Sequence, residues 1–270
     1  MSHPVSDPIS RKLVVANWKM HGSLAFNQAL IAGYLQGLQA LPQTDVVVCV
    51  PYPYLAQMQS LLSGSRIAWG AQNLAKYEQG AYTGEVGASM LCDFGARYVI
   101  IGHSERSTAY CESDENIAEK MMMARRHGLT PILCVGETLL EREAGVMERV
   151  VGKQLETIIR LFGGEAFAGA IVSYEPIWAI GTGLAATAEQ AVSMHQFIRD
   201  TVASADQAAA ATLKILYGGS VNPQNAVQLL NQKEIDGALV GRCSLDVGQF
   251  IKICQAAMTA SSLDSENAKS

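Results

Sequence analysis

The chain has 270 residues, of which 49% are hydrophobic and 17% charged, so it can bury a large core and does not have the composition of a disordered protein. Its formal net charge is -5 and its Lys and Arg residues are scattered, which argues against nucleic acid as a partner. The six cysteines lack Cys-x-x-Cys spacing, so we expect reduced thiols in the core rather than a zinc site or disulfides.

The two ends of the sequence are more polar than the rest. Residues 1–10 contain two prolines and no apolar run, so we expect a loose extension of a cytoplasmic protein, and neither a signal peptide nor a membrane anchor. No apolar stretch approaches the roughly 18 residues that a membrane-spanning helix needs. Residues 259–270 are again polar and predict a frayed tail, which leaves residues 11–258 as the folded domain.

Short apolar runs rich in β-branched residues recur between the two ends, as is typical of parallel strands covered on both faces. They lie at residues 12–16, 46–50, 98–101, 131–135, 170–173, 213–217 and 237–240, with a weaker one at 66–69. Apolar residues at helical spacing lie between the runs, for example Leu30, Tyr34 and Leu38. This alternation predicts one α/β domain, but it does not distinguish a closed barrel from an open doubly wound sheet.

Polar residues follow several of these runs, where the predicted strands end and where α/β barrels carry their active sites. Glu175 precedes Pro176, which keeps its neighbour extended, and we expect an exposed carboxylate suited to act as a general base. His103 follows the run at 98–101, and its neutral imidazole can donate a hydrogen bond to a carbonyl oxygen that gains charge. Taken singly, either residue can equally be an ordinary surface or structural residue.

Lys19 follows the first run, and its ammonium group would attract an anionic substrate. A lysine at such a position can also form a Schiff base with a carbonyl compound, or be a solvated surface residue. No second His or Cys stands at ligand spacing from His103, so no metal site is expected.

Glycines after the last two runs predict a site for a phosphate group. Residues 217–220 read Tyr-Gly-Gly-Ser, and Asn222 followed by Pro223 looks like the start of a helix. Gly241 follows the final run in the same way. Backbone N–H groups can approach an anion closely at such glycines, and barrels recurrently bind phosphate in these two loops.

Residues 181–186 have the spacing of a dinucleotide-binding G-x-G-x-x-G/A signature, but they occur late in the chain and do not directly follow a strand. Glycines and small residues around an apolar tip favour a mobile lid that folds over a ligand and expels water.

Seven segments together resemble the triosephosphate isomerase family. They are Asn17–Met20, Gly70–Asn73, Gly80–Glu85, Ile101–Arg106, Cys134–Glu137, Tyr174–Gly183 and Tyr217–Val221. They occur in the family's order and span nearly the whole chain. The resemblance implies a single-domain (β/α)8 TIM barrel.

The resemblance also implies an activity, the interconversion of dihydroxyacetone phosphate and D-glyceraldehyde 3-phosphate through an enediolate, in glycolysis and gluconeogenesis. Glu175 would move the proton between carbons, neutral His103 would polarise the carbonyl, and Lys19 would supply positive charge. The substrate contacts that it implies are Asn17, Lys19, Gly181, Ser220, Gly241 and the backbone amide of Arg242. No metal or organic cofactor is implied, because the substrate carbonyl itself accepts the electrons.

The family is further expected to form a homodimer in which the loop around Thr83 reaches the partner's site. This sequence has a loop bounded by Gly80 and Gly87 at that place.

Three positions depart from the family's pattern. Arg242 replaces the second of two glycines after the last strand, and a side chain restricts the backbone there. Leu184–Ala186 replaces a more polar segment at the far end of the lid, and Ser107 stands where many relatives have arginine.

Two further hypotheses remain open from the sequence. One is a Schiff-base aldolase that uses Lys19, and the other is a catalytically idle barrel with a binding role.

Overall fold

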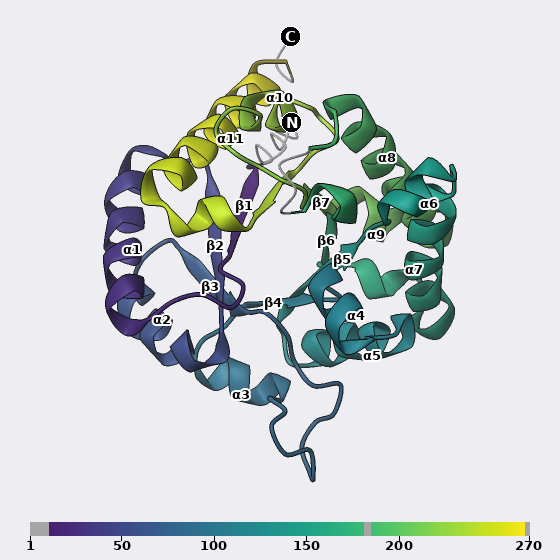
Figure 1. Ribbon diagram of the computed structural model, residues 1–270, viewed down its shortest axis with the longest axis horizontal. Coiled ribbons are helices and arrows are strands. Elements are labelled where there is room, and N and C mark those ends of the chain that lie inside the picture. Colours follow the sequence, from purple (N-terminus) through teal and green to yellow (C-terminus); the bar gives the residue numbers. More distant parts are fainter. Residues whose placement is uncertain (1–10, 181–184, 268–270) are drawn as a thin grey trace, which may run out of the picture.

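Eight parallel strands close into a barrel, and helices surround it on the outside (Figure 1). The computed structural model describes residues 11–180 and 185–267. The strands are β1 (Leu13–Asn17), β2 (Asp45–Val50), β3 (Ala68–Ala71), β4 (Tyr98–Ile101), β5 (Thr130–Val135), β6 (Ile171–Tyr174), β7 (Lys214–Tyr217) and β8 (Gly237–Val240). Pairing of β1 with β8 completes the circle, which confirms the predicted TIM barrel and excludes an open sheet.

Helices follow the strands and form the outer layer. The α-helices are α1 (Leu24–Gly37), α2 (Leu55–Leu62), α3 (Ala88–Asp93), α4 (Ser104–Tyr110), α5 (Asp114–Arg126), α6 (Leu139–Glu143), α7 (Met147–Phe162), α8 (Ala188–Ala205), α9 (Gln207–Thr212), α10 (Ala226–Leu230) and α11 (Val247–Asn267). Short 3-10 helices are η1 (Leu38–Ala40), η2 (Tyr52–Tyr54), η3 (Gly164–Phe167), η4 (Ile177–Ala179) and η5 (Arg242–Leu245). None of the helices in the described ranges is long and apolar enough to cross a membrane.

Local sequence signals explain where several helices begin. Ser113 caps α5 by accepting the Asn116 N–H, and acidic residues fill the first turn of that helix. Thr187 and Gln190 form a reciprocal capping box at the start of α8. Such caps satisfy backbone N–H groups that have no partner within the helix.

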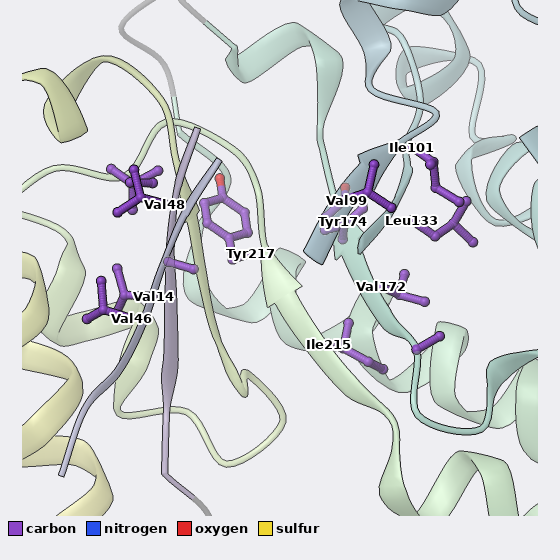
Figure 2. Packing of buried hydrophobic residues seen from close by; sticks show 14 of the residues in the cluster. Val14, Val46, Val48, Val99, Ile101, Leu133, Val172, Tyr174, Ile215 and Tyr217 are labelled. Atoms are coloured by element: carbon purple, nitrogen blue, oxygen red, sulfur yellow. The ribbon is translucent and has the colours of Figure 1, made fainter. Parts of the chain in front are cut away.

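Successive side chains of a strand point to opposite faces of the sheet. In these strands the side chains on both faces are mainly apolar. In β1, Leu13 and Val15 belong to the cluster inside the barrel. Val14 and Ala16 belong instead to the larger cluster between strands and helices. Figure 2 shows part of that outer cluster, in which side chains from several strands lie away from the barrel interior. Burial on both faces is the reason why the sequence has nearly continuous apolar runs.

Three details differ from the sequence predictions. Strand β3 starts two residues later than the predicted run, and the Arg66 side chain instead donates to the carbonyl oxygens of Leu41 and Thr44 in the connection before β2. Helix α11 continues to Asn267, across the boundary predicted at residue 259, and buried Ser261 accepts the Lys12 N–H at 3.1 Å. The predicted N-terminal extension at residues 1–10 lies outside the described residues.

All six cysteines are free, and the expectation that they lie in the core is wrong for two of them. Cys49, Cys134, Cys243 and Cys254 are buried, whereas Cys92 and Cys111 are exposed. Cys92 lies in the last turn of α3, and Cys111 directly follows α4.

A buried histidine lies behind strand β6. His195 of α8 places its ring edge-on to Tyr174, and its Nδ1 is 3.1 Å from the carbonyl oxygen of Glu234, to which a neutral ring donates. Its Nε2 has no hydrogen-bond partner in the described part of the chain. Burial lowers the pKa of His195 from 6.5 to about 4, because a charged ring would lose its hydration.

We expect His195→Phe to flatten the pH dependence of stability. The pKa of His195 in the folded protein lies below its unfolded value of 6.5, so the unfolded chain takes up a proton first as pH falls. The free energy of unfolding is therefore unaffected by His195 above pH 6.5 and decreases as pH falls towards about 4. Between pH 7 and 4 the unchanged protein should lose about 3 kcal/mol more unfolding free energy than the variant. Urea denaturation across this range measures the difference, and parallel curves would contradict the expectation.

Candidate active site

A cavity of about 540 Å³ opens at the carboxyl ends of the strands. Its walls come from the residues that follow β1, β4, β6, β7 and β8. The predicted site residues among them are Asn17, Lys19, His103, Glu175, Ser220, Gly241 and Arg242. The structure therefore brings together every predicted site residue that it describes, whereas Gly181 lies outside the described residues.

Glu175 is the first residue after β6, and its backbone N–H donates to the carbonyl oxygen of Val135 at 2.7 Å. Its side chain is only 2% exposed, so the expectation of an exposed carboxylate is wrong. Neighbouring strand ends enclose it, and its Oε2 accepts the Ser104 N–H at 3.3 Å. A Cβ atom at position 218 would lie 2.7 Å from Glu175 Cγ, so glycine there leaves room for the carboxylate.

His103 caps α4 and presents its other nitrogen to Glu175. Its Nδ1 accepts the Glu105 N–H at 3.2 Å, which leaves the proton of a neutral ring on Nε2. Nε2 lies 3.4 Å from Glu175 Oε1, an oxygen that has no hydrogen bond of normal geometry with any described residue. A candidate base and a candidate hydrogen-bond donor thus stand side by side in the cavity.

Lys19 has an unusual backbone conformation, with a φ of 51° that is uncommon for a residue other than glycine. Two side chains hold it there, since Asn17 Oδ1 accepts the Lys19 N–H at 3.0 Å and Gln72 Nε2 donates to the Lys19 carbonyl oxygen at 2.9 Å. The Lys19 ammonium group pairs with Glu105 at 2.5 Å. Strain of this kind clusters at functional sites, where surrounding contacts enforce it.

The loops after β7 and β8 bring glycines to the cavity wall at positions 218, 219 and 241. A Cβ atom on Gly219 would lie 2.3 Å from the Tyr217 hydroxyl oxygen, so only glycine fits. Asn225 Nδ2 donates to the Ser220 carbonyl oxygen at 2.8 Å and fixes the first loop. Backbone N–H groups can approach an anion closely at glycines placed in this way, so binding of a phosphate in these loops stays a prediction.

Arg242 has a backbone conformation that does not require glycine. It is the first residue of η5, and among the described non-glycine residues only Lys19 and Cys111 have positive φ. The side chain at this departure from the family's pattern therefore imposes no backbone strain.

Asn222 makes the capping contacts predicted for it, and its carbonyl oxygen accepts the Ala226 N–H at 3.0 Å, although the regular part of α10 begins later. Asn222 Oδ1 accepts the N–H groups of Gln224 and Asn225 and so heads a turn, and α10 begins only at Ala226. The short turn satisfies these N–H groups before the helix begins.

Glu137 is a structural anchor that the sequence did not reveal. Its buried Oε1 accepts the Tyr174 hydroxyl at 3.0 Å, the Trp178 indole N–H at 2.9 Å and Arg142 Nη1 at 3.1 Å. Its carbonyl oxygen also accepts the Ile177 N–H at 3.0 Å. The position of Glu137 just after a buried strand could have marked it as a residue of interest. The sequence did not show, however, that three donors surround its carboxylate.

The phenols near this anchor stay protonated. Burial raises the pKa of Tyr174, and the nearby Glu137 carboxylate raises it further. Burial also raises the pKa of Tyr217 to about 12, and the hydroxyl of this residue accepts the Ala186 N–H at 3.0 Å. Glu137 and Tyr217 thus hold the chain on either side of the predicted lid, whose residues 181–184 lie outside the described residues.

The described residues contain no group of three or more His, Cys, Asp or Glu side chains placed to hold a metal ion.

Comparisons with known proteins agree with this geometry. A profile of the triosephosphate isomerase family matches residues 12–257. The chain belongs to the triosephosphate isomerase family. It is 55% identical to the triosephosphate isomerase of Thiobacillus denitrificans over 92% of this chain and 98% of that protein. It is 52% identical to that of Dechloromonas aromatica over 92% and 99% of the two chains, and 50% identical to that of Nitrosomonas eutropha over 91% and 98%.

We expect Glu137→Ala to lower the free energy of unfolding by about 3–5 kcal/mol, because it removes the buried acceptor shared by Arg142, Tyr174 and Trp178. Glu137→Gln is the matched variant, since it keeps an acceptor oxygen and should cost less. Urea denaturation followed by tryptophan fluorescence measures both. Equal stability of the alanine variant and the unchanged protein would contradict the anchoring role.

Proposed function

We propose that this chain interconverts dihydroxyacetone phosphate and D-glyceraldehyde 3-phosphate. Family membership supports this activity, and so does one geometric observation, the 3.4 Å contact between His103 Nε2 and Glu175 Oε1 inside a cavity that also holds Lys19. A carboxylate base, a neutral donor and a cation around one small space suit proton transfer next to a carbonyl group.

Glu175 takes the proton in this proposal. Its carboxylate removes a proton from the carbon next to the substrate carbonyl and returns it to the neighbouring carbon, with an enediolate between the two steps. Burial supports this role, because a carboxylate that is 2% exposed and leaves one oxygen without a hydrogen bond is poorly solvated, so little water competes with the substrate for that oxygen.

His103 and Lys19 stabilise the charge that develops on oxygen. The Nε2–H of His103 donates to the substrate oxygen, and its Nδ1 cannot compete because it already accepts the Glu105 N–H. Lys19 contributes positive charge, and Asn17 fixes the lysine by accepting its N–H. Preorganised donors of this kind need no rearrangement as the negative charge forms.

The loops after β7 and β8 hold the phosphate in the proposed complex. Ser220, Gly241 and Arg242 line the cavity, and the backbone amide of Arg242 is proposed to donate to the phosphate. Gly181 is proposed to join them from the lid. Once the phosphate is bound, the length of the substrate places its reacting carbons next to Glu175.

We expect Glu175→Gln and His103→Gln each to lower kcat by about 1000-fold, because each removes one proton-transfer or charge-stabilising group. A coupled spectrophotometric assay of triose phosphate interconversion measures both. Glu165→Gln is a matched control on η3, outside the cavity lining, and should leave kcat unchanged. Near-normal turnover in both site variants would reject the proposed roles.

The two alternative hypotheses receive less support. Lys19 Nζ pairs with Glu105 at 2.5 Å, an arrangement that suits a fixed cation better than a Schiff-base nucleophile. An idle barrel would not need Glu175 and His103 in contact at the cavity wall. Borohydride treatment with substrate separates these ideas, since a mass increase on Lys19 would favour the aldolase.

We infer that two copies of the chain form a dimer through the loop around Thr83. The connection between β3 and α3, which carries this residue, projects from the barrel at the bottom of the view in Figure 1. A groove of about 510 Å³ beside the active site is lined by Met20, Tyr52 and Tyr110, and it shares Lys19 and His103 with the active-site cavity. Met20 is 93% exposed and Tyr110 69% exposed, as expected of apolar side chains that a partner covers.

We expect Thr83→Asp to weaken this dimer, because burying an additional charged group in the interface costs its hydration. Light scattering after gel filtration should give twice the 28.9 kDa chain mass for the unchanged protein and a smaller mass for the variant. Thr259→Asp adds the same charge on the exposed side of α11 and serves as control. A single-chain mass for the unchanged protein at micromolar concentration would contradict the dimer.

A further inference from the structure

The active-site cavity contains one cation that no described carboxylate neutralises. Lys19 pairs with Glu105 at 2.5 Å, whereas the Arg242 guanidinium makes no hydrogen bond or ion pair with any described residue. Arg242 is exposed and lines the cavity, in a protein whose formal net charge is -5. Positive charge without a partner at the mouth of a cavity attracts anions more strongly than a charge held in an ion pair.

The two cations flank one turn of backbone. A Cβ atom on Gly241 would lie 3.3 Å from Lys19 Cε and 4.0 Å from Lys19 Nζ, and Arg242 is the next residue. The turn is fixed, because both the N–H and the hydroxyl group of Ser244 donate to the Gly241 carbonyl oxygen, at 2.8 and 2.7 Å. The backbone that carries the Arg242 side chain is therefore fixed, and it lies in the predicted phosphate loop after β8.

We propose that the side chain of Arg242, and not only its backbone amide, binds the phosphate group of the substrate at the rim of the cavity. The inference rests on the proposed function, which assigns a phosphorylated substrate to this cavity. A planar guanidinium group matches two phosphate oxygens at once and keeps its charge at every physiological pH. The side chain adds affinity for dianions to what the loops after β7 and β8 provide.

The proposed contact predicts a particular kinetic signature. The phosphate does not react, and we expect an exposed guanidinium group at the rim to contact it equally well in the bound substrate and in the transition state. Its removal should raise KM and leave kcat nearly unchanged. Because the group is exposed, salt should screen the contact, and KM should depend on ionic strength less steeply once the charge is gone.

The test compares Arg242→Gln and Arg242→Lys with Arg126→Gln, which removes an exposed arginine of α5 outside the cavity lining. We expect Arg242→Gln to raise KM about 3- to 10-fold, with kcat within about 2-fold. The lysine variant should recover part of the loss, and Arg126→Gln should match the unchanged protein. Competitive inhibition by inorganic phosphate should weaken by the same factor as KM rises.

Calorimetric titration with inorganic phosphate separates this inference from the proposed function, because it needs no turnover. Weaker phosphate binding in Arg242→Gln supports the guanidinium contact even if the chain proved inactive as an isomerase. Unchanged phosphate affinity and unchanged KM in an active, folded Arg242→Gln variant would overturn it. A fall in kcat with KM unchanged would also overturn it, since that result would place Arg242 in the chemical step.

Discussion

Closure of the sheet between β1 and β8 is the constraint on which the rest of the structure depends. Residues Leu13 to Ala16 pair with residues Gly237 to Val240, so the first and last strands meet although more than two hundred residues separate them. Because all strands run parallel, their carboxyl ends surround one opening. Lys19, His103 and Glu175 follow three different strands and reach the same cavity for this reason.

Two buried carboxylates show how the same fold serves two purposes. Glu137 Oε1 is saturated by three donors, so it holds the chain before the lid in one position. Glu175 has a single backbone donor on Oε2 and leaves Oε1 without a hydrogen bond to the described residues, so it remains available to a ligand. Each of the two carboxylates keeps one oxygen without a hydrogen bond to the described residues. Their positions distinguish them, because Glu175 lines the active-site cavity whereas Glu137 is not part of its lining.

The site also depends on close approaches of backbone that the barrel geometry demands. Gly218 makes room for the Glu175 side chain, and Gly219 makes room for the Tyr217 hydroxyl group. Lys19 adopts positive φ because Asn17 and Gln72 bind its backbone from both sides. These contacts fix the positions of the charged groups around the cavity. The unpaired guanidinium group of Arg242 can therefore attract an anionic ligand to a defined place.

The sequence by itself determined the α/β alternation, because apolar runs and helical spacing are local properties, and its motifs pointed to the site residues that lie at strand ends. It left open whether the sheet closes, and resemblance to a family decided this before the structure did. Only the tertiary structure decided that Glu175 is buried, that Glu137 collects Tyr174, Trp178 and Arg142, and that Arg242 stands without a counter-charge. Burial and charge pairing depend on which distant segments pack together, and spacing along one chain does not encode that directly.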